Sequence, residues 1–393
     1  MGNMWYNCLE FPYICRDFGD QIQLSICFVG IVTACDMSDR IARRWQEEIR
    51  KLKDYKIVEK EAKESFIPTY VYKSEYNQAM ALKVKLMREH WRKPLEAAIP
   101  GQTISNDYGS CYYIQSEANL IFQKLDFEKS KQAILSNLKL IYGIGDVRER
   151  ALKHQGYRSI EDLTHHPLWG ESAQKFMDIF VSQNTISLQN ELWHWLPKSH
   201  PLLLYLTGLH EMDDFVIFDV ESMGLFERPI ILVGVARPKP KAKKIVIHQY
   251  LLRDIADEPS ALYEFISHLK GNVALITFNG RAFDIPYVEA RLNFYGIGAV
   301  INKPHFDILH FARRVWQEKL PDCRLVTIEN YIMRVKREND IPAALVPDFY
   351  ATYLRTKNVG PLIAIIEHNR DDLITLASVF SKLCESCKDE SYY

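Results

Sequence analysis

Two acidic residues interrupt an otherwise apolar, strand-like run of the sequence, VIFDVESMGL (residues 216–225). Side chains alternate along a β-strand, so Asp219 and Glu221 share one face of this run. Two buried carboxylates repel each other and are costly to desolvate unless a cation neutralises them. Hard divalent cations prefer oxygen ligands, so the pair indicates a Mg²⁺ or Mn²⁺ site. A strand end whose acids simply reach water explains the pair equally well.

Two later segments carry acids that would complete such a site. LITFNGRAFDIPYVEARL predicts a strand, a turn at Asn279 and a helix that begins near Asp284. EHNRDDLITLASVF predicts an apolar-faced helix, on which His368 and Asp372 lie four residues apart and share one face. Each segment also has an ordinary explanation, because Asp284 suits a helix N-cap and a lone histidine is more often hydrogen-bonded or surface-exposed than catalytic.

Two further acids are candidates beside the same site. Asp371 is a rival for Asp372, since it lies three residues from His368 on the same predicted helix. Asp307, in HFDIL, either supports the site from behind its ligands or merely ends a strand.

The second half of the chain has the element order of one α/β domain. Three strand-like runs (FVIFDVE, PIILVGVA and KIVIHQYLL) are followed by helix, strand, helix, strand and helix. This order predicts a mixed sheet flanked by helices over residues 211–388. Upstream, we expect an α+β region at 37–128, with strands at YVYKSEY and CYYIQS, and a helical region at 129–200. Residues 1–36 are interpreted as a dispensable or non-native start, because Met37 opens a polar, helix-like run.

The helical region contains a possible anion-binding turn. SKQAILSNLKLI, YGIG and DVRERALKHQG predict a helix, a glycine turn and a second helix, and this series resembles the helix-hairpin-helix module. Gly143 and Gly145 would let the backbone approach a phosphate, while the N–H groups that begin the second helix point at the anion. A plain helical hairpin is the alternative. The cationic contacts expected around this turn are Arg148, Arg150 and Lys153.

Composition leaves the substrate open. The formal net charge is −1, from 49 basic and 50 acidic side chains, and a local basic groove is compatible with a neutral total. The eight cysteines are scattered, which favours reduced thiols in a cytoplasmic protein. The apolar run IQLSICFVGIVTAC is shorter than the roughly 20 residues of a membrane-spanning helix, so we expect no membrane partner. No protein partner is predicted.

Together, FDVES, FNGRAFDIP and HNRDD resemble the three exonuclease motifs of the DnaQ-like (DEDD) superfamily. From Asp214 to Leu383 the chain is more closely similar to the YprB-type ribonuclease-H-like family. The resemblance implies a ribonuclease-H-like fold and two Mg²⁺ or Mn²⁺ ions, with His368 orienting or deprotonating the attacking water. In the third motif this histidine stands at the short spacing where many relatives have tyrosine. The implied metal ligands are Asp219, Glu221, Asp284 and Asp372.

The resemblance implies a 3′→5′ exonuclease that releases nucleoside monophosphates, with Asn279 among the contacts to nucleic acid. DNA is favoured over RNA because the helix-hairpin-helix-like region would hold a nucleic-acid backbone without reading bases. Two alternatives stay open. One is a structure-specific or RNA–DNA hybrid endonuclease, and the other is a non-catalytic scaffold that binds nucleic acid.

Overall fold

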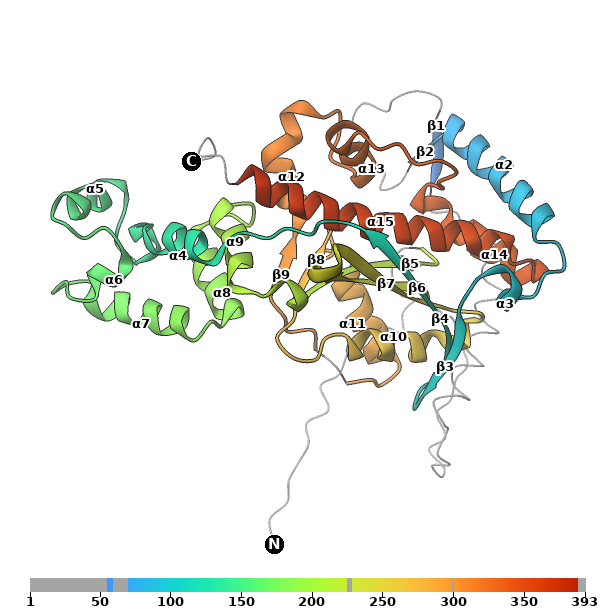
Figure 1. The fold of residues 1–393 in the computed structure, drawn as a ribbon, viewed down its shortest axis with the longest axis horizontal. Coiled ribbons are helices and arrows are strands. Elements are labelled where there is room, and N and C mark those ends of the chain that lie inside the picture. The colour runs from blue at the N-terminus through green and yellow to red at the C-terminus, as the bar shows by residue number, and fades with distance from the viewer. Residues whose placement is uncertain (1–54, 59–69, 225–227, 299, 388–393) are drawn as a thin grey trace, which may run out of the picture. The chain divides into compact units, whose positions relative to one another are not determined.

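The computed structural model describes residues 55–58, 70–224, 228–298 and 300–387 (Figure 1). The expectations for residues 1–36 and for the polar run after Met37 lie outside these ranges. No helix in the described part of the chain is long and apolar enough to cross a membrane.

A mixed sheet of seven strands organises the described residues, in the order β3-β4-β7-β6-β5-β8-β9. An interior strand of this sheet, β5, runs antiparallel to β6 and parallel to β8. Apolar, largely β-branched and aromatic residues fill β5 and β6, as expected for strands that are covered on both faces. The strands are β3 (Gln102–Asn106), β4 (Gly109–Asn119), β5 (Phe215–Ser222), β6 (Ile230–Lys239), β7 (Lys244–Leu251), β8 (Ala274–Thr277) and β9 (His305–Asp307).

The two faces of β5 pack against different helices. Phe218 stacks on Phe265 of helix α10 (Glu258–Ser267), with ring centroids 4.1 Å apart. Phe215 instead meets Phe380 of helix α15 (Gly360–Ser386), at 5.4 Å. Figure 1 shows α15 and α10 on opposite sides of the sheet. The strand alternation therefore turns both acids of the FDVES motif toward α15.

Further helices complete the two layers. Helix α11 joins α10 on its face, where Glu258 and Arg291 form a fully buried ion pair with an N–O distance of 2.6 Å. Removing one partner of such a pair typically costs about 3–5 kcal/mol, because the other charge is left buried alone. The remaining helices after β5 are α11 (Asp284–Phe294), α12 (Ile308–Trp316), α13 (Leu325–Ile328) and α14 (Val346–Thr356), and a π-helical turn, η8 (Glu329–Met333), follows α13.

The region expected at 37–128 contributes directly to this sheet. Strand β4 pairs with β7 along its length, so the β3–β4 hairpin extends the sheet at one edge. The strand predicted for CYYIQS lies within β4, but the one predicted for YVYKSEY was too long. Strand β2 (Tyr70–Tyr72), which pairs with β1 (Lys56–Val58), ends where α2 (Lys73–Glu89) begins. The Glu75 carboxylate accepts a hydrogen bond from the Tyr72 N–H (3.1 Å) and so caps the new helix.

The helical region lies between β4 and β5 in the chain. The continuous first helix expected from SKQAILSNLKLI is interrupted, because the Asn137 side chain accepts a hydrogen bond from the Lys139 N–H (3.2 Å). Gln189 exchanges two hydrogen bonds with the backbone of His305 in β9, which fastens the region to the sheet. Its helices are α4 (Phe127–Leu135), η2 (Leu138–Leu140), α5 (Asp146–His154), α6 (Ile160–Leu163), α7 (Gly170–Val181), α8 (Thr185–Trp195) and α9 (Pro201–Tyr205).

Candidate metal site

Three side chains converge between β5 and α15. The ligand atoms of Glu221, His368 and Asp372 all lie within 4.8 Å of one another. The His368 Nε2 atom is 3.9 Å from a Glu221 oxygen and 3.7 Å from an Asp372 oxygen. His368 and Asp372 are one helical turn apart on α15, so both face the strand. The Glu221 carboxylate of the first motif and the His368 and Asp372 side chains of the third therefore meet at the interface between β5 and α15.

Asp219 lies beside this group and is held by Asn369. The amide Nδ2 of Asn369 donates to the Asp219 carboxylate at 2.8 Å. The strand partner of Asp219 in β6 is Gly234, and a side chain at that position would collide with Asn369. Gly234 thus leaves the space through which α15 reaches the first acid of the motif.

Asp284 arrives at the site from the turn after β8. It is the first residue of α11, and Phe283 is the N-cap, so Asp284 does not play the N-cap role considered from sequence. The turn is tied by Asp307, whose carboxylate accepts hydrogen bonds from the Asn279 N–H (2.8 Å) and the Arg281 N–H (3.2 Å). Asp307 therefore supports the segment that carries Asp284. Asn279 itself is exposed, with a left-handed backbone (φ +64°).

The structure separates the two rival acids of the third motif. The Asp372 side chain is 17% exposed and faces His368, whereas Asp371 is 35% exposed and contacts Arg370 at 3.5 Å. Asp372 is therefore the acid of this pair that faces His368, and Asp371 contacts Arg370 instead.

Sequence reasoning missed two charged residues that complete the surroundings of His368. Asp340 accepts a hydrogen bond from His368 Nδ1 at 2.7 Å, which leaves Nε2 facing the acids. Arg337 lies 2.7 Å from Asp372 and also pairs with Glu329 (2.6 Å) and Asp340 (3.3 Å). Both residues come from an irregular stretch between η8 and α14, where no periodicity marks their direction. Asn369 lies within the HNRDD motif, but nothing in the sequence marked it as a functional residue.

Burial perturbs the ionisation of these acids strongly. Desolvation raises the pKa of Glu221 to about 8 and the pKa of Asp284 to about 7. Burial, reinforced by Asp372 and Glu221, raises the pKa of Asp219 well above its usual value. Burial alone would lower the pKa of His368, but Asp372, Glu221 and the hydrogen bond to Asp340 outweigh it and raise this pKa to about 10. The cluster thus holds more negative charge than its protein neighbours balance.

These properties fit a divalent cation. Carboxylate oxygens are the ligands that Mg²⁺ and Mn²⁺ prefer. The His368 Nε2 atom is buried and has no hydrogen-bond partner within the described chain. A cation held by the acids would favour their ionised forms and so offset the burial and the mutual repulsion that raise their pKa values.

The helix-hairpin-helix-like turn belongs to the helical region and not to this cluster (Figure 1). Gly143 has a left-handed backbone (φ +83°), and Gly145 is the N-cap of α5 without a side-chain cap. Arg148 donates to the Gly143 carbonyl (2.6 Å) and Lys153 pairs with Glu149 (3.1 Å). Arg150 donates to the Asp146 carbonyl (3.3 Å), so all three cationic contacts expected here already have partners within the hairpin.

The pKa values predict how stability depends on pH when metal is chelated. A raised acid pKa means that the folded state keeps a proton that the unfolded state has lost. The contribution of this bound proton to the stability of the folded state is therefore complete below about pH 4.5. It is lost as the pH rises toward the Glu221 pKa of about 8. In EDTA, we expect the free energy of unfolding of the wild type to fall as the pH rises from 5 to 8. The slope of this fall should be steeper than that of Glu221→Gln by up to ~1.4 kcal/mol per pH unit.

Urea denaturation across this pH range measures both slopes. Saturating Mg²⁺ or Mn²⁺ should flatten the wild-type slope, because a cation replaces the protons. Parallel slopes for the two proteins in EDTA would contradict the buried-carboxylate assignment.

Comparison with known proteins agrees with the fold and the position of the site. A family model described as the RNase_H superfamily matches residues 216–384, from β5 into α15. The chain is 28% identical over 206 residues to "Uncharacterized protein YprB" of Bacillus subtilis (strain 168). That match covers 51% of this chain and 48% of the relative, so it spans about half of the relative's length.

The ribonuclease-H-like mixed sheet expected from the sequence is thus confirmed. The comparisons thus support a ribonuclease-H-like domain of the YprB type at residues 216–384.

Proposed function

We propose that the protein is a metal-dependent 3′→5′ exonuclease, with DNA as the favoured substrate. One observation carries the proposal: buried carboxylates converge on the Nε2 atom of His368, which has no hydrogen-bond partner among the described residues. A buried imidazole beside a carboxylate cage suits the removal of a proton from water next to bound cations. The 3′→5′ direction follows from the resemblance of the three motifs to DnaQ-like exonucleases.

Asp219, Glu221, Asp284 and Asp372 would hold two Mg²⁺ or Mn²⁺ ions. Such ions would supply an activated water and stabilise the departing oxygen of a phosphodiester. Asn369 orients Asp219 through its amide hydrogen bond.

Asp340 gives His368 a defined role. As the acceptor of the Nδ1 proton, it orients the ring and leaves Nε2 to take a proton from water. The acids that raise the His368 pKa would be neutralised by cations, which brings the imidazole closer to its neutral, proton-accepting form. Arg337 pairs with the Asp372 carboxylate oxygen that does not face His368 and so limits the rotation of this side chain.

We further propose that the helix-hairpin-helix-like turn binds the backbone of duplex DNA. The amide groups that begin α5 would supply anion contacts behind the Gly143–Gly145 turn. Because such contacts do not touch base edges, binding would be independent of sequence.

The catalytic proposal predicts a clear result with end-labelled DNA. Wild type with Mn²⁺ or Mg²⁺ should shorten single-stranded DNA from its 3′ end and release nucleoside monophosphates. Asp219→Asn removes one negative ligand and should lower the rate on the order of 100-fold or more. Asp371→Asn is the matched control, because the Asp371 carboxylate contacts Arg370 and not His368, and it should retain most of the activity.

The substrates in this assay separate the alternatives. Cleavage of circular single-stranded DNA would favour an endonuclease, and parallel reactions with RNA and RNA–DNA hybrids measure the sugar preference. Absence of hydrolysis by the wild type, or equal rates for wild type and Asp219→Asn, would contradict the proposal and favour a binding scaffold.

The hairpin proposal predicts an effect on binding alone. Gly143→Ala places a side chain on a left-handed backbone, which costs roughly 1–2 kcal/mol in that conformation and should displace the turn. Fluorescence anisotropy in EDTA should show weaker binding of a blunt duplex. Gly271→Ala imposes the same kind of strain (φ +81°) after α10 and should bind as the wild type does. Equal duplex affinity of both variants would exclude a role for the turn.

A further inference from the structure

A groove of about 800 Å³ leads away from the carboxylate cluster. His368 and Asp372 line its inner part, next to the irregular stretch that carries Arg337 and Asp340. One wall comes from α13 and the segment after it, and the other comes from α2, including Gln78, Leu82 and Lys85. The site therefore opens onto a surface that the N-terminal part of the chain helps to build.

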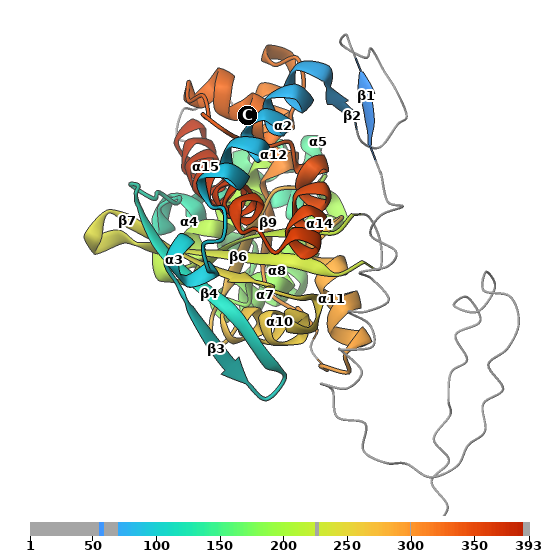
Figure 2. The same cartoon turned by 90° about the vertical axis from the view of Figure 1, so that its right-hand side faces the viewer.

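Helix α2 is firmly attached to the domain that holds the site. The Asn358 amide donates to the Met87 carbonyl at 2.8 Å. At Gly360, where α15 begins, a side chain would meet the backbone of Leu86 at 2.5 Å. Ala79 and Leu82 belong to the same hydrophobic core as the first turns of α15. Figure 2 shows α2 beside α15 and α14. The wall is thus part of the folded domain.

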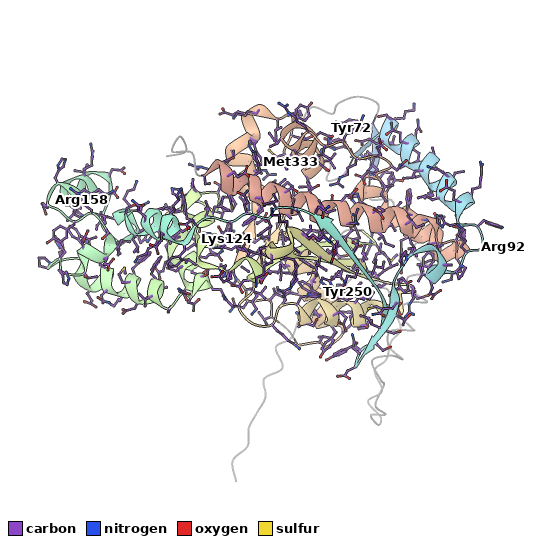
Figure 3. All side chains as sticks on the ribbon, in the orientation of Figure 1. Tyr72, Arg92, Lys124, Arg158, Tyr250 and Met333 are labelled. Atoms are coloured by element: carbon purple, nitrogen blue, oxygen red, sulfur yellow. The ribbon has the colours of Figure 1, made fainter. Side chains whose placement is uncertain are left out.

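The groove presents two lysines whose charge no ion pair in the described chain balances, although Glu75, Asp340 and Asp372 also line it. Lys85 on α2 and Lys336 on the opposite wall are both exposed, and neither forms an ion pair or side-chain hydrogen bond within the described chain. Arg324 adds a third cation, which pairs with Asp322 and lies 5.8 Å from the Tyr70 ring centroid. Figure 3 shows Tyr72 at the start of α2 and Met333 on the segment that follows α13. Two free lysines on facing walls suit a polyanion that runs between them.

We propose that this groove binds the sugar–phosphate backbone of a single-stranded nucleic-acid end and leads it to the carboxylate cluster. This inference rests on the proposed nuclease function. The volume lies within the ~300–1,000 Å³ of clefts that enclose small ligands, which suits a few nucleotides of one strand and not a duplex. The N-terminal region, to which sequence analysis assigned no chemistry, thereby gains a role in holding the substrate.

The test is equilibrium binding of a fluorescein-labelled dT₁₂ oligonucleotide to the full chain in EDTA, at several salt concentrations. Each phosphate contact on a single strand contributes about 0.7 to the slope of log K against log salt. The double variant Lys85→Ala/Lys336→Ala should bind more weakly, and its slope should be smaller by ~1.4 for two lost contacts. The matched control, Lys241→Ala/Lys270→Ala, removes the same charge from exposed positions outside the groove and should match the wild type.

Equal slopes for the two double variants would overturn the inference, as would an equal loss of blunt-duplex binding in the groove variant. Both pairs of lysines are exposed, so circular dichroism and melting temperature should confirm unchanged folding. Hydrolysis of thymidine 5′-p-nitrophenyl phosphate, which is too small to reach the groove walls, should be unaffected by Lys85→Ala/Lys336→Ala. If the wild type leaves the end-labelled nucleic-acid substrates uncleaved, the nuclease proposal is contradicted while the binding experiment still decides the role of the groove.

Discussion

Like charges buried on the α15-facing side of β5 are the constraint on which the site depends. Asp219 and Glu221 cannot turn away, because the alternate positions of the strand are filled by core residues such as Phe218. Their charge must be compensated locally, since an unpaired carboxylate in a dry interior is strongly unfavourable. The arrangement of α15 and of the stretch between η8 and α14 follows from this requirement.

Protein groups supply part of that compensation. Asn369 donates to Asp219, and Arg337 bridges Glu329, Asp340 and Asp372. Partial compensation is consistent with the direction of the shifts: burial still raises the pKa of Glu221 to about 8, and surrounding acids raise that of His368 to about 10. The protein groups around the acids allow the domain to fold but leave the site short of positive charge, which favours the binding of divalent cations. This shortage links the packing of the strand to the proposed chemistry.

The fold could be predicted where periodicity is strong. The strand alternation in FDVES and the helical spacing of His368 and Asp372 both depend on local geometry, and the structure brings these residues together. Asp340 and Arg337 could not be predicted, because they act through an irregular stretch whose path is set by tertiary contacts. The need for Gly234 was equally hidden, since it arises only when the Asn369 side chain of α15 packs against β6 at this position. The attachment of β4 to β7 and of α2 to α15 joins elements far apart in the sequence, and composition alone did not indicate it.

Locating bound Mn²⁺ tests the metal site most directly. A crystal of the full chain grown with Mn²⁺ and measured near the manganese absorption edge would show ions as anomalous difference peaks. The metal-site assignment predicts two peaks within coordination distance of Asp219, Glu221, Asp284 and Asp372. In a crystal of Asp219→Asn, both peaks should be absent or markedly weaker. Full occupancy by manganese elsewhere, with no peak between β5 and α15, would contradict it.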